Sequence, residues 1–212
     1  MADLIFYTNP QSRGQTVRWM LEEVGAPYDT EILDYASTMK AEPYLSINPM
    51  GKVPAIKHKG KVVTEVAAIC CYLADAFPEA GLAPPPADRA DYYRWIFFTS
   101  GPVEAAFSNK AAGWEPTPER QRMFGYGNYD LAIATFEKAI AGREYIAADF
   151  FTAADLFVGA NVNFMLAFNL LEPRPAFVDY ARRMTDRDAY RRAKEIDSAL
   201  IAEAQARQDE PA

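Results

Sequence analysis

A proline-rich segment divides this sequence into two parts with different hydrophobic patterns. Residues 78–88 contain four prolines and a glycine, and neither a helix nor a strand can run unbroken through such a segment. Short strand patterns alternate with helical ones before it, whereas only helical patterns follow it. We therefore expect an α/β domain at residues 1–78, a linker at residues 79–88 and an all-α domain at residues 89–212.

The first part has the pattern of a small α/β domain. Apolar residues 4–7 are typical of a buried strand, and the helical repeat that follows ends at Gly25. The turn at residues 58–60 has the composition of a hairpin between two strands. The expected elements are strand 4–7, helix 17–24, strand 28–33, a short helical segment 37–46, strands 53–57 and 61–63, and helix 66–77. Their order is βαβαββα.

The second part shows helical patterns throughout. Thr152 and Asp155 have the spacing of a capping box, with Asp in place of the usual Glu or Gln at the fourth position. The expected helices cover residues 88–112, 118–141, a segment after Thr152, 175–185 and 188–204. Pro118 suits the start of its helix because the first helical position tolerates proline.

Composition excludes several classes of partner. The chain has 29 acidic and 22 basic residues, so it lacks the basic footprint that binds nucleic-acid phosphates. The most apolar run, residues 153–171, contains Asp155 and three asparagines, and we interpret it as a buried helix rather than a membrane span. The start of the chain lacks a basic and apolar leader, and the two cysteines are neighbours, so we expect a cytoplasmic protein.

A proline at the start of a strand allows two interpretations of residues 48–55. Pro54 has no N–H for a sheet ladder, so it could simply end a loop and begin an edge strand. Alternatively, a cis bond between Val53 and Pro54 would turn the N–H and C=O of Val53 outward, where an extended peptide could pair with them.

Three ordered motifs resemble those of the cytosolic glutathione transferases, of the bacterial type and without a definite class. They are residues 48–54 (NPMGKVP), residues 64–73 (TEVAAICCYL) and the capping box at residues 152–155. The family pattern in the second motif is Glu-Ser-x-Ala-Ile, so Val66 departs from it. The resemblance covers nearly the whole chain and implies a thioredoxin-like N-terminal domain with a mixed sheet, an all-α C-terminal domain and a homodimer.

The resemblance also implies how glutathione would bind. Val53, beside cis-Pro54, would pair with the cysteinyl part of glutathione, and Glu65 would meet the α-amino group of the γ-glutamyl end. Val66 would offer its N–H at a helix N-terminus but lacks the serine hydroxyl, a loss of about 1 kcal/mol if one hydrogen bond is missing. Lys52 is a candidate for the glycine carboxylate or an ordinary surface lysine.

Two residues are candidates for stabilising the glutathione thiolate. Tyr7 ends the first strand, as in the tyrosine-using classes of the family, although a tyrosine there can also serve only in packing. Ser12 lies at the mouth of the first helix, where a hydroxyl can cap the helix or face an anion. Asn9 is a third possible donor in this loop, and Arg13 would add positive potential. The loop has no cysteine, which argues against the branch that forms mixed disulfides with glutathione.

Other polar and aromatic residues have less specific interpretations. Phe107 and Trp114 are candidates for a second-substrate pocket, which the resemblance places toward the end of the first long helix, although most aromatic residues at helical spacing belong to the core. Cys70 and Cys71 are adjacent in a helix, which suits core packing and not a disulfide. His58 has no cluster of metal-binding side chains around it in the sequence, so we expect no metal site.

The resulting hypothesis is a homodimeric detoxification enzyme that adds glutathione to small apolar electrophiles. A glutathione-dependent peroxidase, dehalogenase or isomerase would use the same thiolate, and the sequence does not separate these activities. A non-catalytic binding or interaction module with the same architecture is the alternative outside the enzymes, and Val66 is the feature that favours it.

Overall fold

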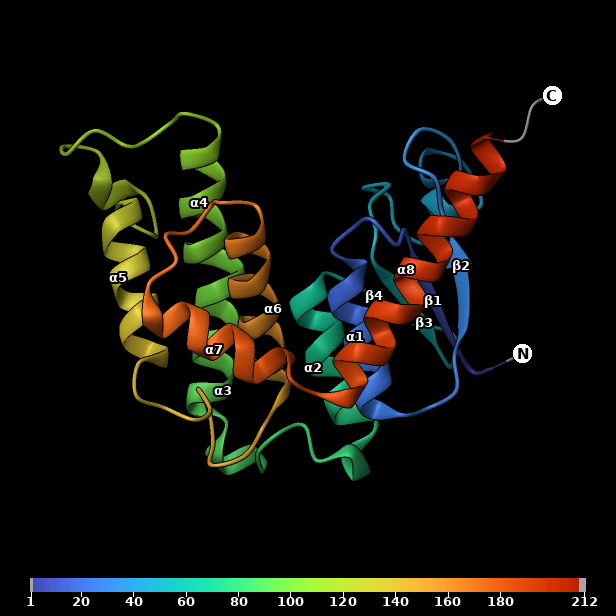
Figure 1. The fold of residues 1–212 in the computed structure, drawn as a ribbon, viewed down its shortest axis with the longest axis horizontal. Helices are drawn as coiled ribbons and strands as arrows, with labels where there is room; N and C mark the ends of the chain where they lie inside the picture. Colours follow the sequence, from blue (N-terminus) through green and yellow to red (C-terminus); the bar gives the residue numbers. More distant parts are fainter. Residues whose placement is uncertain (1, 210–212) are drawn as a thin grey trace. The chain divides into compact units, whose positions relative to one another are not determined.

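The computed structural model describes residues 2–209, which divide into two compact units (Figure 1). The chain up to Ala80 and helix α8 (Asp188–Asp209) form the first unit, and Gly81–Asp186 form the second. The expected limits at 1–78, 79–88 and 89–212 remain predictions, and residues 210–212 lie outside the described range. The grouping of α8 with the first unit was not anticipated from the sequence.

A four-stranded mixed sheet forms the centre of the first unit. Its strands are β1 (Leu4–Thr8), β2 (Asp29–Ile32), β3 (Ala55–His58) and β4 (Lys61–Thr64), in the order β2-β1-β3-β4. Strand β1 runs parallel to β2 and antiparallel to β3, and β3 runs antiparallel to β4. With helices α1 (Gly14–Val24) and α2 (Val66–Ala76), the expected βαβ and ββα halves and the mixed sheet are confirmed.

The segment between β2 and β3 differs from the expected helix at residues 37–46. Two short 3-10 turns occupy it, η1 (Thr38–Lys40) and η2 (Tyr44–Ser46). Pro43 lies between them and has no N–H for a helical hydrogen bond, so a single helix cannot continue through it.

Side chains of β1 alternate between the two faces of the sheet. Phe6 is fully buried and lies 5.1 Å, from ring centroid to Cζ, under the guanidinium of Arg18 on α1. Tyr7 points to the opposite face, where it packs against the buried residues Met39 and Tyr44. The end of β1 therefore places Tyr7 on the face covered by η1 and η2.

Helix α8 packs along α1 within the first unit, and Figure 1 shows the two helices side by side. Trp19 and Tyr190 meet edge to face, with ring centroids 5.0 Å apart. Arg18 and Asp197 form a buried ion pair between the helices. The last helix of the chain thus covers part of the first unit's core.

The second unit is helical, as expected. Helix α3 (Ala90–Phe98) continues through a π-helical segment, η5 (Thr99–Val103), into α4 (Glu104–Ala111). The expected long helix at 88–112 is therefore present, with its hydrogen bonding altered around Pro102. Short 3-10 turns, η3 (Pro78–Ala80) and η4 (Pro86–Asp88), occupy the proline-rich segment.

The expected helix at 118–141 starts later than predicted. Only a 3-10 turn, η6 (Gln121–Met123), forms before α5 (Tyr129–Ile140). The side chain of Asn128 accepts the N–H of Leu131 and caps α5. A good N-cap after two glycines therefore fixes the start, and Pro118 does not.

The capping box expected at Thr152 is confirmed at the start of α6 (Ala153–Ala167). Both residues of the box, Thr152 and Asp155, are buried, and Asp155 also accepts the N–H of Ile146 and the hydroxyl of Tyr180. Helix α6 packs against α3 and α7 (Pro175–Thr185). Within residues 2–209, no helix combines the length and apolarity needed to span a membrane.

Candidate functional site

The sheet register gathers several candidate residues at one end of the first unit's sheet. Tyr7 on β1 pairs with Ala55 on β3, and Ala55 pairs with Thr64 on β4. The Tyr7–Ala55–Thr64 row is thus the point from which three loops leave the sheet. The loop after Tyr7 carries Ser12, the turn before Ala55 carries Val53, and the residue after Thr64 is Glu65.

Asn9 organises the loop that follows β1. Its side chain donates to the carbonyl of Leu33 over 2.8 Å and accepts the N–H of Gln11 over 3.0 Å. Its main-chain carbonyl accepts both the N–H and the hydroxyl of Ser12. The Asn9 amide is therefore engaged by the protein's own backbone, and its geometry is that of a residue that shapes the loop.

The Ser12 hydroxyl is also engaged. It donates to the carbonyl of Asn9 over 2.6 Å and accepts the N–H of Gly14 over 2.9 Å. A Cβ at Gly14 would lie 2.0 Å from Thr8 Oγ1 and 2.9 Å from Ser12 Oγ. Ser12 lies just before α1, and a helix N-terminus is a favourable place for an anion. The hydroxyl proton of Ser12, however, points to the Asn9 carbonyl.

The Tyr7 hydroxyl differs from that of Ser12 in its hydrogen bonding. It is half-buried, and its hydroxyl makes no hydrogen bond to any residue in the range 2–209. Burial, followed by the negative charge of Glu31, raises its pKa above the ordinary value of 10.0. The phenol therefore stays protonated at neutral pH and retains its donor. Its ring packs on Tyr44, with centroids 5.7 Å apart and planes tilted by 44°.

The turn before β3 contains the expected cis bond between Val53 and Pro54, which is confirmed. The carbonyl of Lys52 accepts the Tyr44 hydroxyl over 2.5 Å and Asn48 Nδ2 over 2.7 Å. Val53 lies two residues before Ala55, the first residue of β3, and is outside the strand pairing. The side chain of Lys52 is exposed.

Glu65 has an unusual main-chain conformation at the start of α2. Its φ of 68° and ψ of 122° fall in a region that non-glycine residues rarely occupy. Such a conformation costs of the order of 1–3 kcal/mol and persists only where the surroundings enforce it. The side chain of Glu65 is exposed, and Val66 begins the helix, so its N–H is one of those that a helix leaves free for an anion.

Tyr44 is the site residue that sequence reasoning did not identify. It is buried, and it contacts both Tyr7 and the turn that carries Val53. The contact with Lys52 depends on how the chain folds back after η2, and no motif encodes it. The one available signal was an aromatic residue close before the Asn48–Pro49 turn.

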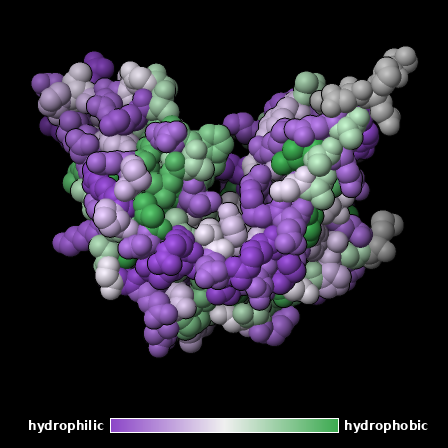
Figure 2. Space-filling model, in the orientation of Figure 1, coloured by the Kyte–Doolittle hydropathy of each residue, from purple (hydrophilic) through white to green (hydrophobic). Residues whose placement is uncertain are grey.

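The two candidates for a second-substrate pocket belong to the second unit. Phe107 on α4 is buried, whereas Trp114, past the end of α4, is 42% exposed. Trp114 meets Phe124 edge to face, with centroids 5.1 Å apart. Figure 2 shows apolar side chains gathered over α4 and α6 and hydrophilic ones over α7.

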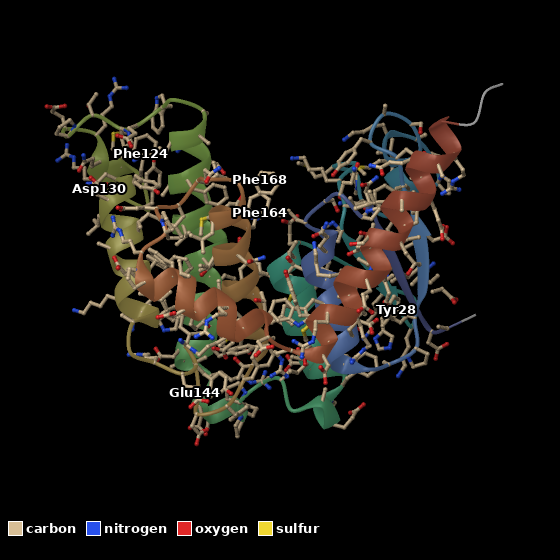
Figure 3. The ribbon with its side chains drawn as sticks, viewed as in Figure 1. Tyr28, Phe124, Asp130, Glu144, Phe164 and Phe168 are labelled. Atoms are coloured by element: carbon tan, nitrogen blue, oxygen red, sulfur yellow. The ribbon has the colours of Figure 1, made fainter. Side chains whose placement is uncertain are left out.

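A further aromatic pair lies at the end of α6. Phe164 and Phe168 have ring centroids 4.6 Å apart, and Figure 3 shows them close together. Phe168 is 63% exposed. This pair was not among the residues predicted to line a pocket.

Cys70 and the histidine take part in packing. Cys70 on α2 is fully buried, and burial raises the pKa of its thiol. His58 Nδ1 lies 3.0 Å from the hydroxyl of Tyr72, and its ring stacks on Phe77. Among residues 2–209, no three His, Cys, Asp or Glu side chains are grouped as a metal site would require.

Known proteins share this fold and these segments. The family model of the glutathione S-transferase N-terminal domain matches residues 12–76. Protein LigF of Sphingobium sp. is 29% identical over 181 residues, which cover 66% of this chain and 67% of LigF. Glutathione S-transferase GST-4.5 of Xanthomonas campestris pv. campestris is 27% identical over 159 residues, covering 72% of this chain and 78% of that protein.

Solved structures agree over a larger part of the chain. A sphingomonad glutathione S-transferase complexed with glutathione is 26% identical, with a TM-score of 0.71, covering 92% of this chain and 98% of that one. A glutathione transferase from Methylococcus capsulatus str. Bath is 24% identical, with a TM-score of 0.75, covering 92% and 99%. The fold of this chain is thus that of the glutathione transferases. The matching N-terminal domain, the curated relatives and the shared fold support a bacterial-type cytosolic glutathione S-transferase.

Proposed function

We propose that this protein binds glutathione, stabilises its thiolate and transfers it to small apolar electrophiles. The observation that carries the proposal is the Tyr7–Ala55–Thr64 row, from which the candidate thiolate donors, Val53 and Glu65 all extend at one end of the sheet. The glutathione held by the sphingomonad relative supports the same ligand here.

Glutathione is proposed to lie as an extended peptide beside the turn before β3. The N–H and C=O of Val53 would pair with its cysteinyl part, since Val53 lies outside the strand pairing and next to cis-Pro54. Glu65 would accept the α-amino group, and the N–H of Val66 would take the neighbouring carboxylate at the helix N-terminus. Lys52, with its exposed side chain, is the proposed partner of the glycine carboxylate.

Tyr7 is the proposed thiolate donor, because its hydroxyl is protonated and has no partner among the described residues. A free thiol has a pKa of about 8.5, and lowering it by about 2 units requires about 2.7 kcal/mol of preference for the anion. One or two well-directed donors in a partly dry site supply this amount. Ser12 and the N-terminus of α1 are the second proposed source, assisted by Arg13, while Asn9 holds the loop in place.

The proposed reaction needs no further cofactor. The thiol releases its proton to solvent, the sulfur electron pair forms a new C–S bond to the electrophile, and a leaving group departs with its bonding pair. In an addition reaction, the electrophile takes up a proton instead. Phe107 and Trp114 are proposed to contact the apolar part of the electrophile, and a cytoplasmic homodimer remains a prediction.

The test is a titration of the protein-bound glutathione thiol, followed by the ultraviolet absorbance of the thiolate against pH. We expect saturable binding at millimolar glutathione and a thiol pKa well below that of free glutathione. Binding without a lowered pKa would favour the second candidate, a non-catalytic glutathione-binding module, which Val66 in place of serine supports. Absence of binding would refute both.

A further inference from the structure

The carbonyl of Lys52 receives two hydrogen bonds from buried side chains. The Tyr44 hydroxyl donates over 2.5 Å and Asn48 Nδ2 over 2.7 Å. Tyr44 is 2% exposed and Asn48 is 6% exposed. Because a carbonyl oxygen has two lone pairs, these donors use its full accepting capacity and hold it in one direction.

The direction of this carbonyl determines where the next N–H points. Cis peptide bonds occur within residues 2–209 at Glu42–Pro43 and Val53–Pro54, and the Lys52–Val53 bond is trans. In a planar trans peptide, the C=O and the N–H point in opposite directions. Since the Lys52 carbonyl faces Tyr44 and Asn48, the N–H of Val53 faces away from them. Hydrogen bonds to the carbonyl also polarise the peptide and strengthen the N–H as a donor.

Tyr44 contacts a second part of the site with its ring. The ring packs on Tyr7, and both residues belong to the cluster around Met39 and Ala55. The hydroxyl and the ring of Tyr44 therefore have separable contacts, one with the turn that carries Val53 and one with the candidate thiolate donor.

We infer that Tyr44 is a positioning residue for glutathione. Through the Lys52 carbonyl, its hydroxyl directs the Val53 N–H toward the main chain of the bound peptide, with Asn48 as the second anchor. This inference rests on the proposed function and concerns binding, not thiol ionisation. Tyr44 itself touches neither the substrate nor the reacting sulfur.

The decisive variant is Tyr44→Phe, which removes the hydroxyl and keeps the ring on Tyr7. By calorimetric titration with glutathione, we expect the Kd to rise about fivefold to tenfold, the effect of one hydrogen bond. The thiol pKa of the bound glutathione should stay at the wild-type value. Tyr129→Phe is the matched control, because it removes a tyrosine hydroxyl that donates to a main-chain carbonyl, that of Leu170, in the second unit. Its Kd should be unchanged.

A spectroscopic signal reports the positioning directly. In protein labelled with 15N-valine, the Val53 amide resonance should move in Tyr44→Phe before any ligand is added, and Asn48→Ala should move it in the same direction. Asn48→Ala also serves if Tyr44→Phe folds poorly, since it removes the other donor to the same carbonyl.

The outcomes separate this inference from the proposed function. If the wild-type protein binds glutathione but both variants bind equally well and leave the Val53 resonance in place, Tyr44 has no positioning role. A raised thiol pKa with unchanged Kd would mean that Tyr44 acts through Tyr7, which also overturns the assignment. If the wild-type protein fails to bind glutathione, the proposed function itself is refuted.

Discussion

Arg18 Nε donates to Asp197 Oδ1 over 2.7 Å, and this ion pair joins α1 to α8. The two side chains are only 2% and 3% exposed. Arg18 Nη2 and Asp197 Oδ2 have no hydrogen-bond partner in the described part of the chain. Moving two charges out of water costs free energy, which offsets much of their mutual attraction. The main effect of such a pair appears when one member is lost, because the other charge then stays buried without a partner.

Asp197→Asn should destabilise the protein by about 3 kcal/mol, because it leaves the Arg18 guanidinium buried without a counter-charge. The double variant Arg18→Met with Asp197→Leu should recover most of that loss, since it removes both charges and keeps apolar volume. Urea denaturation of the three proteins measures the difference. A single-variant loss below about 0.5 kcal/mol, which is typical of surface pairs, would contradict the buried pairing.

His58 should make stability depend on pH near neutrality. Burial, followed by the positive charge of Lys59, lowers its pKa below the ordinary 6.5. The folded state therefore binds this proton more weakly than the unfolded chain. The His58 contribution is complete above about pH 6.5, and it is lost as pH falls from there through the folded pKa.

The measurement is the urea midpoint of the wild-type protein and of His58→Gln at about pH 7.5 and about pH 5.5. His58 is the only histidine of the chain, so the variant removes the side chain that titrates in this range, while Gln can still bond to Tyr72. The wild-type midpoint should fall more on acidification than that of the variant. Equal falls would mean that His58 has the same pKa in both states.

Tyr7→Phe should return the thiol pKa of bound glutathione toward about 8.5, a loss of about 25-fold in thiolate at about pH 7 if the wild-type shift is about 2 units. Ser12→Ala should change this pKa less, because the Ser12 proton points to Asn9. It should instead lower stability by about 1 kcal/mol. Tyr72→Phe, in which a hydroxyl beside His58 is lost, is the control. The reverse ranking of the first two variants would assign the donor to Ser12.

Substitutions of Glu65 can separate the effect of main-chain strain on stability from the effect of the carboxylate on glutathione binding. Glu65→Gly should be more stable than Glu65→Ala by about 1 kcal/mol, because glycine adopts a positive φ readily. The difference is not larger because glycine loses more conformational entropy than alanine on folding. Both variants should bind glutathione about tenfold more weakly, since both lose the carboxylate. Thermal unfolding and calorimetric titration test the two effects. Equal stability of the variants would exclude strain, and unchanged affinity would exclude Glu65 as the amino-group partner.

Features fixed by neighbouring residues could be predicted from the sequence. The strands and the capping box at Thr152 depend on residue types within a few positions, whereas the cis bond before Pro54 was expected only from the resemblance. The start of α5 was predicted wrongly because proline is a permissive start signal, whereas the Asn128 side chain bonds directly to the helix N-terminus. Local rules work when one signal dominates and fail when two compete.

Contacts between distant segments could not be predicted in the same way. The Arg18–Asp197 bond joins residues 179 positions apart, and hydrophobic periodicity alone does not specify which helices pack together. The Tyr44–Lys52 bond depends on the path of the chain between η2 and β3. The candidates Tyr7 and Ser12 followed from sequence, but the difference between a free and an engaged hydroxyl emerged only from their surroundings.

The packing of α8 on α1 determines when, during synthesis of the chain, the first unit can complete its folding. Asp197 leaves the ribosome 179 residues after Arg18, so at least that length of chain must be synthesised before the two charges can meet. Until then, the N-terminal unit has an uncovered face on α1 and a cation without its counter-charge. A fragment that ends at residue 80 would stay permanently in that state, and we expect the sheet domain to mature only after α8 has been synthesised.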